Sequence, residues 1–256
     1  MTDLPVFNLA GRKALVTGAS RGLGRAIAVA LAAAGADVAL GLRDAGQDEG
    51  VAAEIEGMGR KAVGLQMDVM DLKQSYGAVD RAIAALGHLD ILVNNVGGGT
   101  ERRIEDFPEE EFDSTVARNV KSTFFPSKYV GRNMIARRSG SIVNIGSQAG
   151  AVALPMEAIY CLSKAAVAHM TRCFAVEWGA HNIRVNCVAP TFIETDGTRP
   201  ALSKPDFRAD VIERIAALHR IGEPKEVSGA VVFLCSDAAS MITGQTLLID
   251  GGWTAR

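Results

Sequence analysis

Short apolar segments rich in Val, Ile and Leu alternate along the chain with longer segments of helical periodicity. The apolar segments predict strands at KALVTG, DVALGL, KAVGLQMDV, LDILVNN, GSIVNIGS, IRVNCVAP and GQTLLIDGG. Because they show no alternation of apolar and polar residues, they predict a parallel sheet covered on both faces. Repeated strand–helix–strand units with right-handed crossovers give an α/β fold, a doubly wound Rossmann-type three-layer sandwich with seven parallel strands.

The segments between the strands predict long helices, with end signals that glycine and capping residues supply. The helices are expected at 22–34, 45–58, 109–136, 157–178 and 225–236. Gly35 and Gly59 follow two of them, as glycine commonly does at helix ends. Asp71 and Gln74 predict a capping box at the start of a further helix. Pro126 lies inside 109–136, where it removes a backbone hydrogen bond, so a kink is expected there.

The order of the elements favours a single domain. Residues 1–256 contain no linker, repeat or low-complexity segment between these elements. The exception is TFIETDGTRPALSKPDF after the sixth strand, which is polar and carries two prolines. Loops of this length are often lids, so a substrate lid is expected at about 191–218.

Composition and charge exclude several classes of protein. The chain is 48% hydrophobic and 22% charged with a net charge of −2, which gives no electrostatic footprint for nucleic acid or anionic membrane. MTDLPVFNLAGRK shows no secretory signal, and the longest apolar stretch is too short to span a bilayer. The four cysteines, without CxxC spacing, are expected to be buried free thiols in a reducing compartment. No His, Cys and carboxylate cluster has metal-ligand spacing, so a metal-free cytoplasmic protein is expected.

The first predicted strand runs into the glycine-rich turn TGASRGLG, residues 17–24, which opens the first helix. Glycines at 18, 22 and 24 allow a tight turn and close approach of a pyrophosphate to the backbone N–H groups. Strand–turn–helix junctions also favour glycine without any nucleotide. The position of this turn is the one that dinucleotide binding requires.

The end of the second strand bears on the choice of nucleotide. An Asp or Glu there usually holds the ribose hydroxyls of NAD, whereas this chain has Leu42 followed by Arg43. Arg43, together with Arg21, could bind a 2′-phosphate through charge-assisted hydrogen bonds. NADP(H) is therefore favoured over NAD(H). The alternatives are that Arg43 is only solvated and that Asp44 caps the following helix.

YCLSK places Tyr160 and Lys164 four residues apart, one turn along the same face of a helix. The ordinary pKa of a phenol is about 10, and a nearby cation lowers it. The pair could therefore exchange a proton with a substrate oxygen. Taken alone, Tyr160 could equally be a packing residue.

Five features together resemble the compact form of the short-chain dehydrogenase/reductase family. They are the TGxxxGxG turn, NNVG after the fourth strand, Asn119, Ser147 and YxxxK at Tyr160. The resemblance covers nearly the whole chain. It implies that Tyr160 gives a proton to the carbonyl oxygen in reduction and accepts it in oxidation. Lys164 would lower the pKa of Tyr160 and bind the nicotinamide ribose, Ser147 would hold the substrate oxygen, and Asn119 would anchor a water.

The resemblance also implies a set of cofactor contacts. They are Gly18, Ser20, Arg21, Gly22, Leu23, Gly24, Arg43, Asp68, Val69, Asn95, Gly97, Tyr160, Lys164, Pro190, Ile193 and Thr195. Asp68 would meet the adenine amino group, and Ile193 and Thr195 would lie near the nicotinamide amide and diphosphate. The family usually has glycine where this chain has Thr191, which leaves the local backbone open.

Substrate choice is expected to lie in 97–100, in 148–158 and in the lid, with Gln148, Glu157 and Phe192 as candidate contacts. Gln148 and Glu157 could bond a polyhydroxylated substrate, which favours a sugar, aldonate or polyol, although Glu157 could instead cap its helix. The alternative is a 3-oxoacyl-(acyl-carrier-protein) reductase, with the basic pair Arg137 and Arg138 as docking candidates; otherwise that pair is a solvated loop.

Two further classes are less favoured. A non-catalytic nucleotide sensor and a methyltransferase have no use for the Tyr160 and Lys164 pair. The resemblance also implies a homotetramer, formed through the helices that carry Asn119 and Tyr160 and through the last strand and its helix.

Overall fold

The chain folds around one seven-stranded sheet in this computed structural model, which describes residues 6–255. All neighbouring strands are parallel, in the order β3-β2-β1-β4-β5-β6-β7. The strands are β1 (Lys13–Thr17), β2 (Asp37–Leu42), β3 (Ala62–Gln66), β4 (Ile91–Asn94), β5 (Gly140–Ile145), β6 (Ile183–Pro190) and β7 (Thr246–Ile249). The predicted fold class is confirmed.

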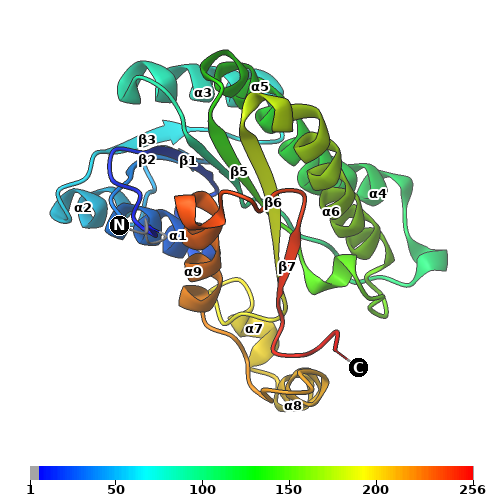
Figure 1. The fold of residues 1–256 in the computed structure, drawn as a ribbon. Coiled ribbons are helices and arrows are strands. Elements are labelled where there is room, and N and C mark those ends of the chain that lie inside the picture. Colours follow the sequence, from blue (N-terminus) through cyan, green and yellow to red (C-terminus); the bar gives the residue numbers. More distant parts are fainter. Residues whose placement is uncertain (1–5, 256) are drawn as a thin grey trace.

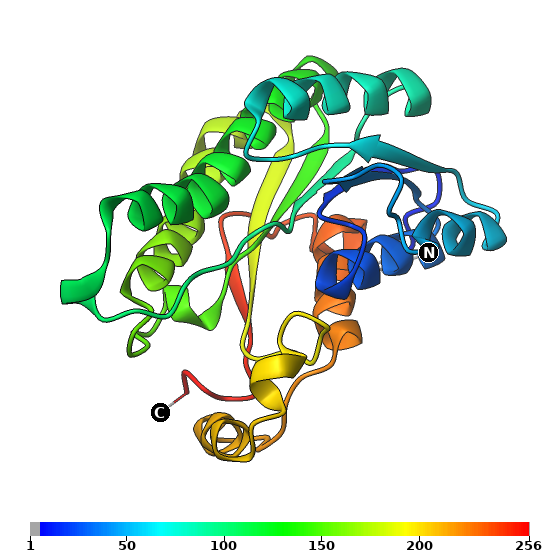
Figure 2. The ribbon, with the colours of Figure 1, turned by 180° about the vertical axis from the view of Figure 1, so that it is seen from behind.

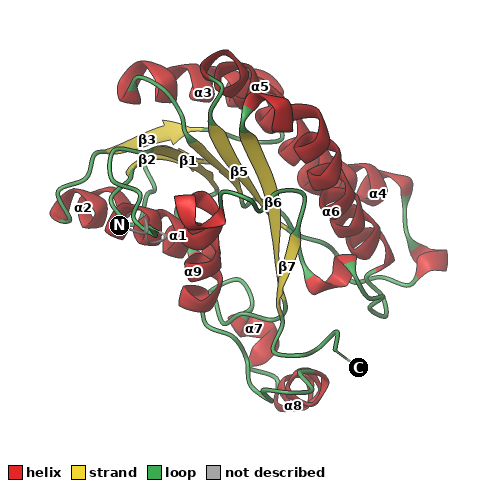
Figure 3. Cartoon of the chain, in the orientation of Figure 1, coloured by secondary structure: helices red, strands yellow, loops and turns green. Residues whose placement is uncertain are grey.

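Helices cover both faces of the sheet (Figure 1). They are α1 (Gly22–Ala33), α2 (Val51–Gly57), α3 (Leu72–Leu86), α4 (Glu109–Val116), α5 (Ser122–Arg137), α6 (Ala158–Trp178), α7 (Arg199–Leu202), α8 (Pro205–Arg214) and α9 (Pro224–Cys235). One layer contains α1, α2 and α9, and the other contains α3, α5 and α6 (Figure 3). The view from behind shows α7 and α8 beyond the sheet (Figure 2).

Successive residues of each central strand enter different cores. Val16 of β1 packs in the cluster that contains Ile27 of α1 and Val231 of α9. Its neighbour Leu15 packs in the cluster that contains Val130 of α5. Because both faces are buried, both kinds of position are apolar, which explains the unbroken Val, Ile and Leu runs.

The strand order reverses between β1 and β4, since β2 and β3 extend to one side and β5, β6 and β7 to the other. Ligands of open α/β sheets bind at such a point, outside the carboxyl ends of the strands. The segments after β1, β4, β5 and β6 all leave the sheet at this edge. They supply most of the site described below.

The helix predicted at 45–58 is shorter than expected, because α2 begins only at Val51. The carboxylate of Asp48 accepts hydrogen bonds from the N–H groups of Gly50 and Ala52, and Gly50 adopts a φ of 79°. Asp44 accepts from the N–H of Gly46, 3.1 Å away, so it does not cap the helix. Local side-chain bonds to the backbone thus replace the first helical turns.

The predicted capping box at α3 is half correct. Asp71 accepts hydrogen bonds from the N–H groups of Lys73 and Gln74, as an N-cap residue does. The side chain of Gln74 instead accepts from the N–H of Asp68. Gln74 therefore joins the helix to the end of the preceding β3 loop.

The helix predicted at 109–136 is α4 and α5 joined by a π-helical turn at Ala117–Lys121. α5 continues through Pro126, so the irregularity lies just ahead of the proline and not at it. The hydroxyl of Thr123 donates to the carbonyl of Asn119 at 2.8 Å and satisfies a carbonyl within this turn. Such π turns occur frequently at functional sites, and this one contains Asn119.

Arg137 and Arg138 are both exposed at the end of α5, as expected for a solvated pair, but each guanidinium also binds the chain. Arg137 donates to the carbonyl of Leu89 at 3.0 Å and to the buried carboxylate of Asp90 at 2.8 Å. Arg138 donates to the carbonyl of Ala180. These contacts lie at the amino ends of the strands, across the sheet from the carboxyl edge.

The four cysteines are free thiols, but only Cys187 and Cys235 are buried; Cys161 is half-buried and Cys173 is exposed, so the expectation that all are buried is wrong for these two. No helix within residues 6–255 has the length and apolar character needed to cross a membrane. No group of three potential metal ligands occurs in the same residues. The expectation about a secretory signal falls partly on residues 1–5, which lie outside the described part of the chain.

Candidate active site

Two adjoining cavities open at the carboxyl edge of the sheet. We name them after one residue each: the Gln148 cavity, of about 440 Å³, and the Lys164 cavity, of about 310 Å³. Both are lined by Gly97, Ser147, Tyr160, Thr191 and Thr198. Molecules that occupied the two cavities would therefore meet at the Ser147 and Tyr160 hydroxyls.

Lys164 is buried at the wall of its cavity, with 4% of its surface exposed. Its Nζ donates to the carbonyl of Ile145, at the end of β5, over 2.9 Å and lies 5.7 Å from the centroid of the Tyr160 ring. Burial lowers the pKa of Lys164 to about 8. A Cβ on Gly97 would lie 2.8 Å from this Nζ, so a larger residue there would displace the ammonium.

The pKa of Tyr160 differs from the expectation. Burial raises this pKa to about 12; the Ser147 hydroxyl partly opposes that rise, and the charge of Glu157 adds to it. The expected lowering by Lys164 is absent in this structure, because the ammonium points to the carbonyl of Ile145. Tyr160 and Lys164 lie close together as predicted, but burial keeps the Tyr160 phenol protonated.

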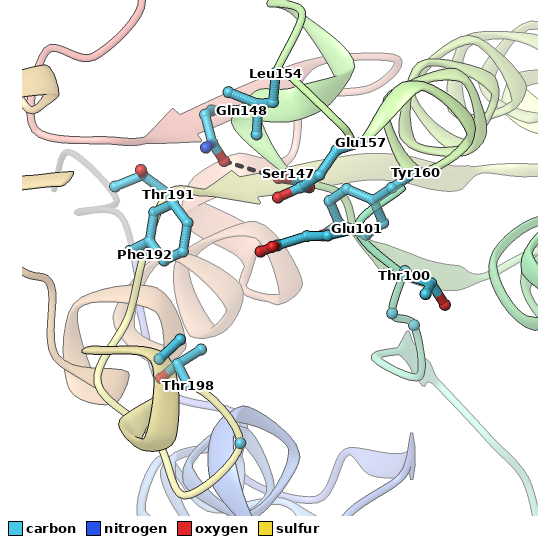
Figure 4. A pocket seen from close by; sticks show the side chains of 15 residues that line it. Thr100, Glu101, Ser147, Gln148, Leu154, Glu157, Tyr160, Thr191, Phe192 and Thr198 are labelled. Carbon is cyan, nitrogen blue, oxygen red and sulfur yellow. Dashed lines mark hydrogen bonds between the residues drawn. The ribbon is translucent and has the colours of Figure 1, made fainter. Parts of the chain in front are cut away.

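Ser147 follows β5 and begins a short 3₁₀ turn. Its Oγ donates to Oε1 of Gln148 at 2.8 Å and accepts from the N–H of Ala149 at 3.1 Å (Figure 4). These bonds fix the hydroxyl at the junction of the two cavities.

Asn119 joins the loop after β4 to the helix that carries Tyr160. Its Oδ1 accepts from the N–H of Gly98, and its Nδ2 donates to the carbonyl of Gly98 and to Oγ of Ser163 at 2.8 Å. An ideal Cβ on Gly97 would lie within 2.9 Å of both Oδ1 of Asn119 and Nζ of Lys164. This loop therefore contacts Asn119, Lys164 and, at Gly99, Tyr160, while Ser147 lines both cavities together with Gly97.

The glycine turn is tightly folded, and its conformation depends on glycine. Gly18 and Gly22 have φ values of 65° and 56°, and a Cβ on Gly24 would lie 2.0 Å from the carbonyl oxygen of Gly18. Arg21 precedes the twelve-residue α1 and makes no side-chain cap, so the first N–H groups of the helix are not bonded by it. This arrangement fits the pyrophosphate of a nicotinamide dinucleotide.

Most of the predicted cofactor contacts lie together. The Lys164 cavity is lined by Arg21, Leu23, Gly24, Asn95, Gly97, Tyr160, Lys164, Pro190, Ile193 and Thr195. Outside that lining lie Gly18, Ser20 and Gly22 in the glycine turn, Arg43 after β2, and Asp68 and Val69 after β3. Arg43 is exposed, and Asp68 accepts from the N–H of Met70 at 2.9 Å.

All three predicted substrate contacts, Gln148, Glu157 and Phe192, line the Gln148 cavity. The side chain of Glu157 makes no capping bond to α6. Glu101, which also lines this cavity, lies outside the expected segments and directly follows 97–100. Thr198 lies within the expected segment 191–218, and its hydroxyl donates to the carbonyl of Ile193 at 2.6 Å.

The fold and the site are those of a dinucleotide-dependent oxidoreductase. A family model described as enoyl-(acyl carrier protein) reductase matches residues 18–254. The chain belongs to the short-chain dehydrogenase/reductase family, whose members interconvert alcohols and ketones.

The relatives differ in their named substrates. D-Threitol dehydrogenase of Mycolicibacterium smegmatis is 39% identical over 250 residues, covering 98% of this chain and 95% of the relative. The 3-oxoacyl-(acyl-carrier-protein) reductase of Escherichia coli is 40% identical over 246 residues, covering 96% of this chain and 98% of the relative. Family membership therefore leaves the substrate open.

Solved structures agree with the fold over nearly the full length. A short-chain alcohol dehydrogenase from Sinorhizobium meliloti has a TM-score of 0.94 at 43% identity, covering 98% of this chain and 99% of that one. A gluconate 5-dehydrogenase of Burkholderia cenocepacia in complex with NADP and tartrate has a TM-score of 0.94 at 33% identity, with 98% of each chain covered. A 7α-hydroxysteroid dehydrogenase with NADH has a TM-score of 0.91 at 34% identity, again with 98% of each chain covered.

The substitution Gly24→Ala tests the glycine turn. We expect loss of measurable NADPH binding, because the added Cβ would lie 2.0 Å from the backbone oxygen of Gly18. Gly229→Ala in α9 is the matched control, since its Cβ would meet nothing within 4 Å. That control should bind NADPH normally and gain about 0.5–1 kcal/mol of stability. Normal binding by Gly24→Ala, measured by NADPH fluorescence, would contradict the assignment of the turn.

Proposed function

We propose that the chain interconverts a ketone and a secondary alcohol with NADP(H), using Tyr160 as the acid and base. The observation that carries this proposal is the position of Ser147 and Tyr160 in the lining of both cavities. A substrate oxygen in the Gln148 cavity can reach these hydroxyls beside a nicotinamide in the Lys164 cavity. When bound, the dinucleotide supplies or accepts the hydride.

The raised pKa of Tyr160 suits the reduction direction. A phenol of pKa about 12 is still a stronger acid than an alcohol, whose pKa is close to the ~16 of water, so proton transfer to a developing alkoxide is downhill. Oxidation needs the phenolate, which at pH 7 would be only about one part in 10⁵ of such a phenol. We therefore propose that Lys164 lowers the pKa of Tyr160 only when the dinucleotide is bound.

Three further roles complete the proposed site. The hydroxyl of Ser147 polarises the substrate oxygen and stabilises its developing charge. Lys164 binds the nicotinamide ribose from the wall of its cavity. Asn119 anchors a water that passes protons from Lys164 towards solvent, and the approach of both side chains to Gly97 supports this role.

We infer that the phosphates lie on the glycine turn, that Asp68 and Val69 lie at the adenine, and that Arg43 binds a 2′-phosphate. The exposed position of Arg43 directly after β2 supports NADP(H) as the preferred cofactor. The gluconate 5-dehydrogenase structure contains NADP, and the 7α-hydroxysteroid dehydrogenase structure contains NADH. Both relatives therefore support a nicotinamide dinucleotide as the cofactor.

The proposed substrate is a sugar, an aldonate or a polyol. Gln148 and Glu157 both face the Gln148 cavity, and relatives are named for threitol and gluconate. A 3-oxoacyl-(acyl-carrier-protein) reductase is the second candidate, which the Escherichia coli relative favours. Against it, Arg137 and Arg138 lie at the amino edge of the sheet, away from the cavities, and could not dock a carrier there.

The four free thiols support a cytoplasmic location.

The substitution Tyr160→Phe tests the acid and base directly. It should lower kcat by about 10²–10⁴-fold, the usual contribution of a positioned proton donor, while NADPH binding stays within about twofold. The absorbance of NADPH, followed with a panel of ketoses, a 5-ketoaldonate, a β-ketoester and a diketone, measures this. Tyr129→Phe is the control, because its hydroxyl bonds only Asp80 on an exposed surface. Full activity of Tyr160→Phe would refute the assignment.

The substitution Arg43→Ala tests the cofactor preference. Loss of a charge-assisted contact to the 2′-phosphate should reduce kcat/KM for NADPH by about tenfold or more and leave that for NADH nearly unchanged. Arg60→Ala, on the loop before β3, should change neither value. If wild-type enzyme already prefers NADH, the proposed role of Arg43 is wrong.

We also propose a homotetramer that uses α5, α6 and β7. Exposed apolar side chains on these elements support it, with Phe124 37%, Leu162 50%, Val176 84% and Leu247 37% exposed. Light scattering should give four times the mass of one chain. A monomer at working concentration would contradict this assembly.

A further inference from the structure

Among residues 6–255, the side chains that line the Gln148 cavity include two carboxylates and no basic group. Glu101 comes from the loop after β4, and Glu157 precedes α6. Both side chains point into the cavity, close to Tyr160 (Figure 4). Burial, and then the charge of Glu101, raises the pKa of Glu157, as expected for an acid that no cation neutralises.

Basic side chains near the cavity are bound elsewhere or stand outside it. Arg102, next to Glu101, donates to the carboxylate of Glu111 at 2.6 Å. Arg214 forms an ion pair with Asp210 at 2.8 Å. The side chain of Arg118 lies 3.8 Å from the position that a Cβ on Gly98 would occupy. Arg118 is exposed, however, and does not line the cavity.

The amide of Gln148 in the cavity lining is suited to a hydroxyl. Gln148 is 3% exposed, and its Oε1 accepts from Ser147. Among residues 6–255, no hydrogen bond involves its Nε2. Besides the hydroxyl groups of its lining, the cavity thus offers one free amide donor and the carboxylate acceptors of Glu101 and Glu157. A hydroxyl group, which both donates and accepts, can bond to both kinds of partner.

On the basis of the proposed function, we propose that Glu101 and Glu157 restrict the substrate to neutral polyols and the ketoses formed from them, and that they reject aldonates. An aldonate carries its own carboxylate into a cavity with two others and no cation, and like charges disfavour binding. A polyol hydroxyl donates a charge-assisted hydrogen bond to the same groups. The two glutamates are specificity-determining residues in this proposal and take no part in proton transfer.

The matched experiment compares an alditol with the aldonate of the same carbon skeleton: threitol with threonate, ribitol with ribonate and glucitol with gluconate. Each is oxidised with NADP⁺, and kcat/KM is measured. We expect at least a tenfold preference for the alditol in every pair that reacts. In the double variant Glu101→Gln with Glu157→Gln, kcat/KM for the aldonate should rise at least tenfold, and that for the alditol should change less. Glu105→Gln, exposed on the same loop, should leave the ratio unchanged.

The pH dependence of the alditol-to-aldonate ratio of kcat/KM shows whether the charge of Glu157 or the shape of the cavity determines the preference. Because the pKa of Glu157 is raised, lowering the pH protonates it before ordinary carboxylates, while the aldonate, with a pKa of about 3.5, stays ionised. The preference for the alditol should therefore narrow as the pH falls, and should be flat in Glu157→Gln. The other titratable groups near Glu157 are Glu101 on the loop, Tyr160 and Cys161 on α6, and Asp210 and Arg214 on α8.

Equal or better use of aldonates by the wild-type enzyme, or an unchanged ratio in the double variant, would overturn the proposal. If no pair reacts, calorimetric titration of the NADP⁺-saturated protein takes the place of turnover, and tighter binding of alditols than aldonates is expected. Binding of neither class also overturns it. Reduction of the diketone or β-ketoester with NADPH in that case would show that the proposed oxidoreductase function survives without this specificity.

Discussion

The buried ammonium of Lys164 is the constraint around which the site is arranged. Within the described residues it has no carboxylate partner, and its Nζ is held by the carbonyl of Ile145. Burying a cation in this way is unfavourable, which is why its pKa falls to about 8. The same burial raises the pKa of the neighbouring Tyr160, so the phenol is protonated in the free protein. The tight packing of Gly97 against Lys164 keeps the ammonium at the wall of the Lys164 cavity.

The parallel sheet delivers each partner of Lys164 to the same edge. β1 ends in the glycine turn, β5 ends at Ile145 and Ser147, and α6 presents Tyr160 one turn before Lys164. Asn119 reaches this edge because the π turn between α4 and α5 places it against Gly98 and Ser163. Buried strands fix the positions, and the loops that follow them carry the chemistry.

The sequence predicts the sheet and the catalytic residues well because both depend on strong, regular signals. The strands are buried on both faces, so their Val, Ile and Leu runs are unbroken, and Tyr160 and Lys164 keep helical spacing. Features governed by local competition were missed: Asp48 shortens α2, and Gln74 bonds to Asp68 instead of closing a capping box. Burial that depends on tertiary packing was also missed, as in the raised pKa of Tyr160 and the ion pair of Arg137 with Asp90.

The most direct test of the acid and base is a spectroscopic titration of Tyr160. The phenolate absorbance of the Tyr160→Phe variant is subtracted from that of the wild-type protein, with and without saturating NADP⁺. We expect no ionisation of Tyr160 below about pH 11 in the free protein, since burial holds its pKa at about 12. With NADP⁺ bound, the phenolate should appear at lower pH. Identical curves with and without NADP⁺ would contradict the claim that the loaded enzyme lowers the pKa of Tyr160 so that the phenol can act as the base in oxidation.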